Sequence, residues 1–172
     1  MGWANAFLSQ LDLTQEFFAA WDDMRVLPEE TITLSILDGE DVVYIACRNG
    51  TRPLGFTFRA GMRLPAVYTA TGKAMLSTLP GSELEQALNH PWPEPLTVHG
   101  PRNKDELMME LNDVQRLGYS VDACGVRDGM HCFGAAVFDS NNRAAVAGVA
   151  VSLLTQEADE AAQRRAGEAM RT

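Results

Sequence analysis

The clearest structural pattern in the chain lies in residues 119–138, YSVDACGVRDGMHCFGAAVF. It has a period of two on both sides of Arg127-Asp128-Gly129, which is typical of two β-strands joined by a turn. After a polar turn at 139–143, residues 145–153 form a third segment of the same kind. The C-terminal third therefore predicts three consecutive strands, over 119–126, 130–138 and 145–153.

A second hairpin is predicted nearer the N-terminus. Residues 31–36 alternate in the same way, and residues 41–48 (DVVYIACR) form its second strand. Asp38-Gly39 between them supplies the positive φ angles that a tight hairpin turn favours. An extended piece is expected after Asn49-Gly50, followed by a short connection at 61–65.

The remaining segments predict helices. Residues 4–24 carry apolar side chains at three- and four-residue spacing, and Pro28 should stop that helix. Further helices are expected at 69–79, from Ser82 with Glu85 in a capping box, from Asn103 with Glu106 in another up to Gly118, and from Thr155 onward. Hairpin-joined strands with helices between the two sets predict an α+β (α/β) domain, with a central, mostly antiparallel sheet flanked by helices.

The composition restricts the class of function. The chain has 172 residues and a net charge of −9, with no basic run longer than Arg164-Arg165. This length suits one domain, and the acidic balance argues against nucleic-acid binding by this polypeptide itself. No apolar stretch is long enough to span a membrane, and the three cysteines lack a CxxC spacing. We therefore expect a cytoplasmic protein, and its start at Met1-Gly2-Trp3 is consistent with a fragment of a larger one.

Strand parity gathers chemically interesting side chains on one face of the predicted sheet. If both strands are regular, Asp122, Cys124, Met130 and Cys132 all project from the same side. An aspartate is rarely buried without a partner, so the pattern fits a hydrogen-bonded structural aspartate or a ligand pocket equally well. A metal site formed by the aspartate and the two cysteines is a weaker alternative, because one strand pair supplies all its ligands.

Other chemistries have less support. His131 and Cys132 are adjacent, but neighbouring side chains on a strand point to opposite faces and cannot form a thiol–imidazole pair. Residues 71–74 (TGKA) lack the upstream glycine and the following Ser or Thr of a phosphate-binding loop, so no nucleotide cofactor is expected. The small residues 69–72 open a helix, where free amides could hold an anion or could instead allow tight packing on the sheet.

Four segments together resemble a known family. Residues 64–77 (LPAVYTATGKAMLS), 116–122 (RLGYSVD), 129–139 (GMHCFGAAVFD) and 146–152 (VAGVAVS) are similar, in order and spacing, to the signatures of the C-terminal effector-binding domain of IclR-family transcriptional regulators. The resemblance covers almost the whole chain. It implies a GAF-like fold over residues 1–172, with the family's N-terminal winged helix-turn-helix DNA-binding domain absent from this chain.

The resemblance also implies where an effector would bind. The positions that match the family's pocket are Ala70, Thr71, Asp122, Cys132, Ala150 and Ser152, with Phe56 and Met130 as looser matches on an apolar wall. The chain departs from the family at Ala150, where a serine is frequent, and at Ala136, where the family has proline.

The function expected from this resemblance is sensing, not catalysis. A small organic metabolite, by default a carboxylate, would bind without cofactor or metal and modulate DNA binding through the missing domain. A homo-oligomer, dimer or tetramer, is expected, with an exposed first helix carrying Trp3, Phe7 and Phe17. The alternative is a small-molecule enzyme that uses Cys132 in the same pocket, which would require a depressed thiol pKa.

Overall fold

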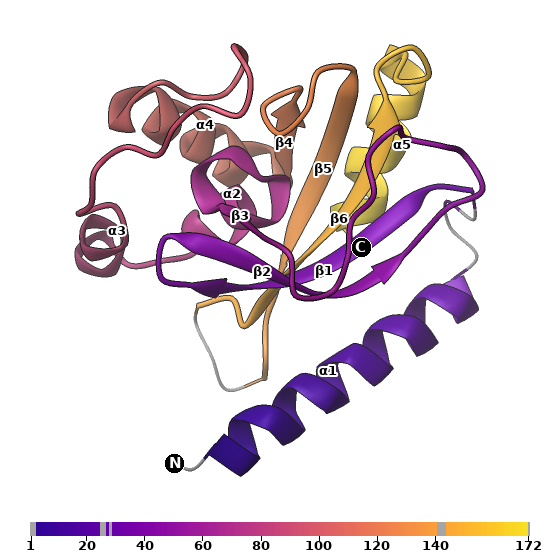
Figure 1. Cartoon of the computed structure of the whole chain (residues 1–172), viewed down its shortest axis with the longest axis horizontal. Helices are drawn as coiled ribbons and strands as arrows, with labels where there is room; N and C mark the ends of the chain where they lie inside the picture. Colours follow the sequence, from indigo (N-terminus) through magenta and orange to yellow (C-terminus); the bar gives the residue numbers. More distant parts are fainter. Residues whose placement is uncertain (1–2, 25–26, 28, 141–143, 172) are drawn as a thin grey trace.

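The computed structural model describes residues 3–24, 27, 29–140 and 144–171. Its centre is a six-stranded sheet with the order β3-β2-β1-β6-β5-β4, and every neighbouring pair is antiparallel (Figure 1). The strands are β1 (Thr31–Asp38), β2 (Asp41–Arg48), β3 (Arg63–Pro65), β4 (Ser120–Ala123), β5 (Met130–Val137) and β6 (Ala147–Leu154). The predicted α+β class is confirmed, and the two hairpin sets meet where β1 pairs with β6.

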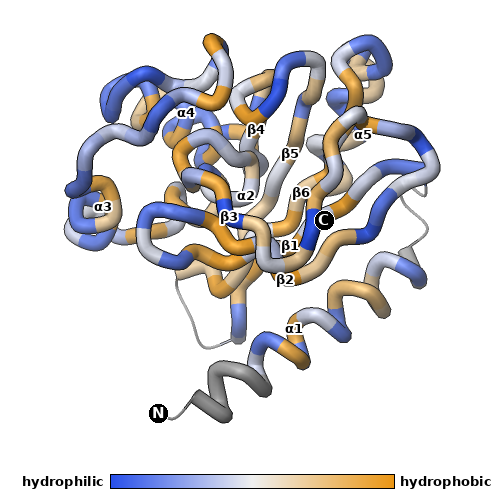
Figure 2. The backbone as a smooth tube through the Cα atoms, in the orientation of Figure 1, coloured by the Kyte–Doolittle hydropathy of each residue, from blue (hydrophilic) through white to orange (hydrophobic). Residues whose placement is uncertain are grey.

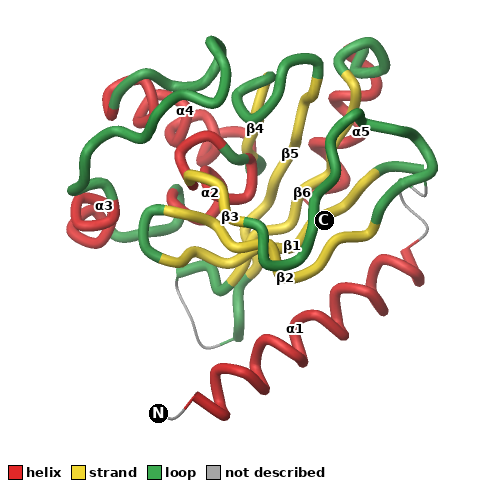
Figure 3. The backbone as a smooth tube through the Cα atoms, in the orientation of Figure 1, coloured by secondary structure: helices red, strands yellow, loops and turns green. Residues whose placement is uncertain are grey.

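Helices cover both faces of this sheet (Figures 1 and 3). They are α1 (Trp3–Met24), the 3-10 turn η1 (Ala66–Tyr68), α2 (Ala70–Leu76), α3 (Gly81–Ala87), α4 (Lys104–Leu117) and α5 (Glu160–Arg171). One core packs α2, α3 and α4 against Val42, Tyr44 and Met130, whereas the other packs α1 and α5 against Ile32 and Phe133. Figure 2 shows the apolar residues gathered on the strands between these layers.

Several local predictions hold because the sequence signals act over a few residues. Asn103 caps α4, since its Oδ1 accepts a hydrogen bond from the Glu106 amide at 2.9 Å, and the helix ends at Gly118 as expected. In a regular capping box the Glu106 carboxylate would accept from the amide of the cap residue Asn103. Here it accepts instead from the amide of the preceding residue, Arg102, at 2.8 Å.

Other local predictions were wrong. The Ser82–Glu85 capping box does not form, because α3 begins at Gly81 without a side-chain cap and Glu85 pairs with Lys104 instead. The predicted connection at 61–65 contains strand β3, the 69–79 helix ends at Leu76, and the last helix starts at Glu160 instead of Thr155. The strand expected over 119–126 stops at Ala123.

The first helix lies on the sheet through its C-terminal half. Phe17 and Trp21 are each only 7% exposed, and their rings stack with centroids 6.4 Å apart. The expectation that Phe17 is exposed is therefore wrong, whereas Leu11 and Phe18 are exposed. The side chains of Trp3 and Phe7 lie outside the described residues. Among the helices that the structure describes, none has the length and apolar character needed to cross a membrane.

Candidate functional site

A closed cavity lies between the first turn of α2 and the sheet, and we call it the α2 chamber. Its lining comes from five strands, from the start of α2 and from two loops: Thr33, Tyr44, Phe58, Thr69, Ala70, Thr71, Asp122, Val126, Cys132, Ala150 and Ser152. Its volume is about 10 Å³, close to the minimum for a single water molecule. The chamber is therefore a convergence of polar groups that is almost fully closed.

The sheet register brings the chamber's polar side chains into a row. Asp122 on β4 lies opposite Cys132 on β5, which lies opposite Ser152 on β6. Facing residues on neighbouring antiparallel strands have Cβ atoms about 4.5–5.5 Å apart and project from the same face. The parity prediction for Asp122 and Cys132 is thus confirmed, and both residues are buried.

Asp122 is completely buried and is held by the loop that follows β4. Its carboxylate accepts hydrogen bonds from the amides of Gly125, at 2.6 Å, and Val126, at 3.3 Å. Burial raises the pKa of Asp122 to about 6, against the opposing effects of the Lys73 charge and the two amides. Asp122 is therefore mostly ionised at neutral pH and can accept a hydrogen bond from a hydroxyl group.

Cys132 and Ser152 form a hydrogen-bonded pair inside the chamber, with Sγ and Oγ 3.2 Å apart. Burial raises the pKa of the Cys132 thiol far above its ordinary value, and the nearby Asp122 charge raises it further. The thiol is therefore protonated at neutral pH. A protonated, fully buried thiol is a weak nucleophile, so the condition for a Cys132-dependent enzyme is not met.

The first turn of α2 is buried tightly against the sheet. Thr69 caps the helix through its side chain, which accepts from the Gly72 amide at 2.9 Å, and Ala70 and Thr71 follow at the chamber wall. A Cβ on Gly134 of β5 would lie 2.7 Å from the carbonyl of Ala70, so only glycine allows this close approach. Residues 69–72 thus pack tightly against the sheet, and Thr69, Ala70 and Thr71 among them also line the cavity.

Two polar residues of the chamber come from the first hairpin, and sequence reasoning missed both. Thr33 on β1 is 1% exposed and Tyr44 on β2 is 3% exposed, and Thr71 on the chamber wall accepts a hydrogen bond from Ser35 at 2.7 Å. The register of β1 and β2 shifts between Leu34 and Ser35, a β-bulge that changes which β2 side chains face α2. The polar face of β1 was visible in the alternation at 31–35, but its burial was not.

A buried cation lies behind the chamber. Lys73 of α2 is 3% exposed, forms an ion pair with Glu110 of α4, and donates to the Val121 carbonyl at 3.3 Å. Its charge opposes the burial effect on the Asp122 carboxyl. The Gly72-Lys73 pair was noted in the sequence only as part of an incomplete phosphate loop, so this role was also missed.

Three of the residues singled out in the sequence lie outside the chamber lining. Met130 is fully buried in the adjoining core, and Phe56 is one ring further out, 4.9 Å from Phe58 between ring centroids. Cys124 was predicted to share the face of Asp122, and this was wrong. The chain turns into a left-handed conformation there, with φ of 64°, and its Sγ contacts His131 and Thr155 instead.

The proposed metal ligands do not assemble. Among the described residues, which include Asp122, Cys124 and Cys132, no group of three or more His, Cys, Asp or Glu side chains could hold a metal ion. The change in direction at Cys124 explains this, because it takes one of the three side chains away from the other two.

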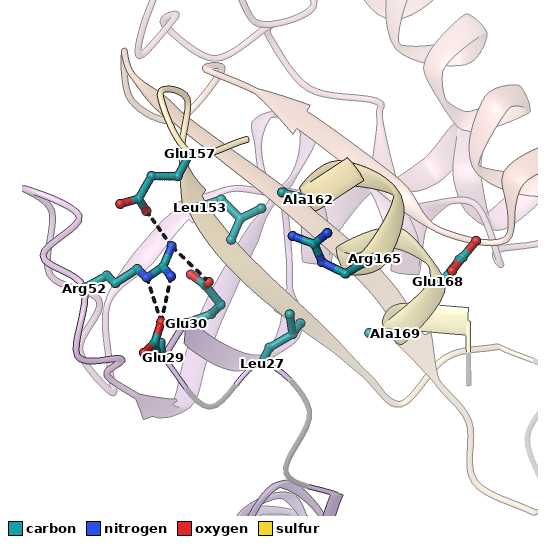
Figure 4. Close-up of a pocket in the computed structure, with 10 residues that line it drawn as sticks. All are labelled: Leu27, Glu29, Glu30, Arg52, Leu153, Glu157, Ala162, Arg165, Glu168 and Ala169. Atoms are coloured by element: carbon teal, nitrogen blue, oxygen red, sulfur yellow. Dashed lines mark hydrogen bonds and ion pairs between the residues drawn. The ribbon is translucent and has the colours of Figure 1, made fainter. Parts of the chain in front are cut away.

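A larger, open groove of about 600 Å³ lies beside α5 (Figure 4). Arg52 on its wall is surrounded by Glu29, Glu30 and Glu157, with N–O distances of 2.7, 3.9 and 3.4 Å. One guanidinium faces three carboxylates here, so the rim keeps an excess of negative charge, and exposed ion pairs of this kind are common surface features. The α2 chamber is the better candidate because its polar groups are buried and converge on one space.

Comparison with known proteins identifies the type of domain. The family model described as "Bacterial transcriptional regulator IclR C-terminal" matches residues 5–172. The HTH-type transcriptional regulator KdgR of Dickeya chrysanthemi is 30% identical over 148 residues, which are 86% of this chain and 48% of KdgR. The chain thus spans about half the length of this curated relative.

Solved structures agree with this match. The repressor BlcR of Agobacterium tumefaciens is 43% identical with a TM-score of 0.87, over 98% of this chain and 66% of BlcR. The C-terminal domain of Escherichia coli KdgR is 25% identical with a TM-score of 0.81, over 92% of both chains. An IclR homologue from Microbacterium hydrocarbonoxydans, solved as a complex with 4-hydroxybenzoate, has a TM-score of 0.80 over 94% of this chain and 66% of that one. At 17% identity it shows a likeness of fold alone.

Proposed function

This chain belongs to the family of C-terminal domains of bacterial IclR transcriptional regulators, and we propose that its α2 chamber binds a small hydroxylated organic acid as the effector. The family is a non-enzymatic one, and the domain binds effectors for a transcriptional regulator.

The observation that carries the proposal is the convergence of buried polar side chains on one closed space. Asp122, Ser152 and Thr33 come from three different strands and are each no more than 1% exposed. Burying polar groups is costly unless they are hydrogen-bonded or serve a ligand. A set that lines a cavity between helix and sheet fits the usual composition of a small-molecule site, in which a few polar groups fix the ligand's orientation.

The polar groups divide into donors and one acceptor. The first amides of a helix have no intrahelical acceptor, so those of Ala70 and Thr71 can donate to a ligand carboxylate, helped by the Ser152 hydroxyl and the protonated Cys132 thiol. Ionised Asp122 can only accept, so it would receive a hydrogen bond from a ligand hydroxyl. 4-Hydroxybenzoate, which the Microbacterium protein was solved with, carries the same two functional groups.

The small volume of the chamber limits the size of the ligand that it can admit. A cavity of about 10 Å³ must expand to admit any organic acid, so the shortest hydroxy acids require the least displacement of Phe58 and Val126. Opening of these loop residues costs free energy, which lowers the apparent affinity. A short aliphatic hydroxy acid is therefore a better first probe than an aromatic one.

Effector binding would act by shifting populations. A ligand that binds one arrangement of the chamber more tightly favours that arrangement, and in a homo-oligomer this would change how the subunits present the DNA-binding domains of the longer relatives. Contact with DNA would be made by such a DNA-binding domain and not by the chain described here, because this chain is acidic, with a net charge of −9.

Calorimetric titration of two matched ligand pairs tests the proposal. The pairs are 3-hydroxybutyrate with butyrate and 4-hydroxybenzoate with benzoate, against the wild type, Asp122→Asn and Asp128→Asn. Asp128 is a matched control because it is an exposed aspartate on the neighbouring turn, with 77% of its side chain accessible. We expect Asp122→Asn to weaken the hydroxy acid by about tenfold and to leave the deoxy acid unchanged.

A second variant tests the carboxylate end. Ser152→Ala should weaken both members of a pair equally, because it removes a donor to the group they share. If neither hydroxy acid binds the wild type, or if the two Asp122→Asn affinities change in parallel, the assigned pocket and its orientation are wrong.

A further inference from the structure

A second cluster of reactive side chains lies on the outer side of the β4–β5 hairpin. Sγ of Cys124 is 3.9 Å from Nδ1 of His131 and 3.5 Å from Oγ1 of Thr155. Nδ1 of His131 and Oγ1 of Thr155 are themselves 2.9 Å apart. A thiol, a hydroxyl and an imidazole thus form one hydrogen-bonded group, outside the α2 chamber.

This environment distinguishes Cys124 from the other two cysteines. Cys132 is buried, and Cys47 is partly buried with a thiol pKa raised by that burial to about 11. Cys124 is half-buried like Cys47, but it differs in lying beside a base. Burial lowers the pKa of His131, so its imidazole is neutral at pH 7 and free to accept a proton.

We propose that Cys124, with Thr155 and His131, is a site of covalent modification by soft carbon electrophiles such as α,β-unsaturated carbonyl compounds. Reactive cysteines are partly exposed thiols beside a group that takes their proton. This site is independent of the effector assignment, because none of its three residues lines the α2 chamber.

The reaction is a conjugate addition. The thiol proton passes to the Thr155 hydroxyl, which gives its own proton to Nδ1 of the neutral His131 tautomer protonated at Nε2. Sulfur forms a bond to the β-carbon as the π bond of the alkene breaks, and the electron pair moves to the α-carbon. That carbon then takes the proton back from His131. Thiol and alkene give a thioether, nothing leaves, and no oxidant is required.

Modification at Cys124 would reach the effector chamber through the backbone. The next two residues are Gly125 and Val126, whose amides hold the Asp122 carboxylate. Thr97 fixes the same segment, since its hydroxyl donates to the Cys124 carbonyl at 2.7 Å. A Cβ on Gly125 would lie 2.6 Å from Oδ1 of Asp122, so the segment has little room to shift without moving that carboxylate.

Alkylation by N-ethylmaleimide at pH 7 tests the site, with the rate at each cysteine followed by peptide mass spectrometry. We expect Cys124 to react at least about tenfold faster than Cys47, and His131→Gln and Thr155→Val each to slow Cys124 about tenfold, within the usual range for general-base assistance. Cys47 in the same sample is the control, because its rate should be unchanged unless the variant unfolds.

Equal rates at Cys124 and Cys47 in the wild type, or an unchanged Cys124 rate in both variants, would overturn the assignment. The coupling to the chamber is measured without any effector, by hydrogen exchange at the Gly125 and Val126 amides before and after alkylation. Exchange that speeds up severalfold supports the coupling, and exchange that stays the same overturns it. Failure of the effector titrations would leave both readouts intact.

Discussion

Replacing Asp122 with asparagine should change how the stability of this domain depends on pH. The carboxyl is fully buried, and its pKa is about 6 in the folded protein, against about 3.9 in an unfolded chain. Between these two values the folded state binds more protons than the unfolded state. The stabilisation from this group is therefore fully present below about pH 4 and is lost as the pH rises through about 6.

The magnitude follows from the difference between the two pKa values. Two pKa units correspond to about 3 kcal/mol, and over the accessible range from pH 4 to pH 7 the expected change is about 2–3 kcal/mol. Asparagine keeps the size and a carbonyl acceptor for the Gly125 amide but does not titrate. The free energy of unfolding of Asp122→Asn minus that of the wild type should thus increase by that amount between pH 4 and pH 7, because only the wild type loses stability over this range.

Urea unfolding followed by circular dichroism at half-unit pH steps measures this difference. Subtracting the two curves cancels the other titrating groups, including His131 and Glu30, which both proteins share. Asp128→Asn supplies the control, because it makes the same chemical change at an aspartate with 77% of its side chain accessible. A difference between wild type and Asp122→Asn that stays constant from pH 4 to pH 7 would refute the inference that burial raises this pKa.

Three further predictions concern the surroundings of the chamber. Gly134→Ala should lower the free energy of unfolding, measured in urea, by about 1–3 kcal/mol, because the new Cβ would lie 2.7 Å from the Ala70 carbonyl. Gly81→Ala is the control and should have little effect, because a Cβ there would have no atom within 4 Å. Lys73→Met should raise the pKa of Asp122 above its value of about 6, as followed by carboxyl NMR, and Lys104→Met, which breaks an exposed pair with Glu85, should not. Asn103→Ala should cost about 1 kcal/mol of unfolding free energy through loss of the α4 cap, and an unchanged denaturation midpoint would contradict that role.

The sequence predicted the parts of the fold that depend on local pattern. Two-residue periodicity placed five of the strands, and the match in parity put Asp122 and Cys132 on one face, where the structure has them facing each other across β4 and β5. Asn103 was identified as a cap because its hydrogen bond reaches only three residues along the chain. These features need no knowledge of distant contacts.

The features that were missed depend on breaks in periodicity and on packing. The bulge opposite Leu34 and Ser35 brings Tyr44 into the chamber, and no residue near it signals a change of register. The left-handed turn at Cys124 separates it from Cys132 and places it beside His131. Parity counting assumes regular strands, so it fails at these two places, and it cannot show that Thr33 and Lys73 are buried.

The assignment of the α2 chamber as the effector site is tested by a crystal structure of the domain grown with 3-hydroxybutyrate. We expect electron density for the acid inside an expanded α2 chamber, with its hydroxyl within hydrogen-bond distance of Asp122 and its carboxylate near Ser152 and the first turn of α2. Density in the groove beside α5, with the α2 chamber still closed, would contradict it.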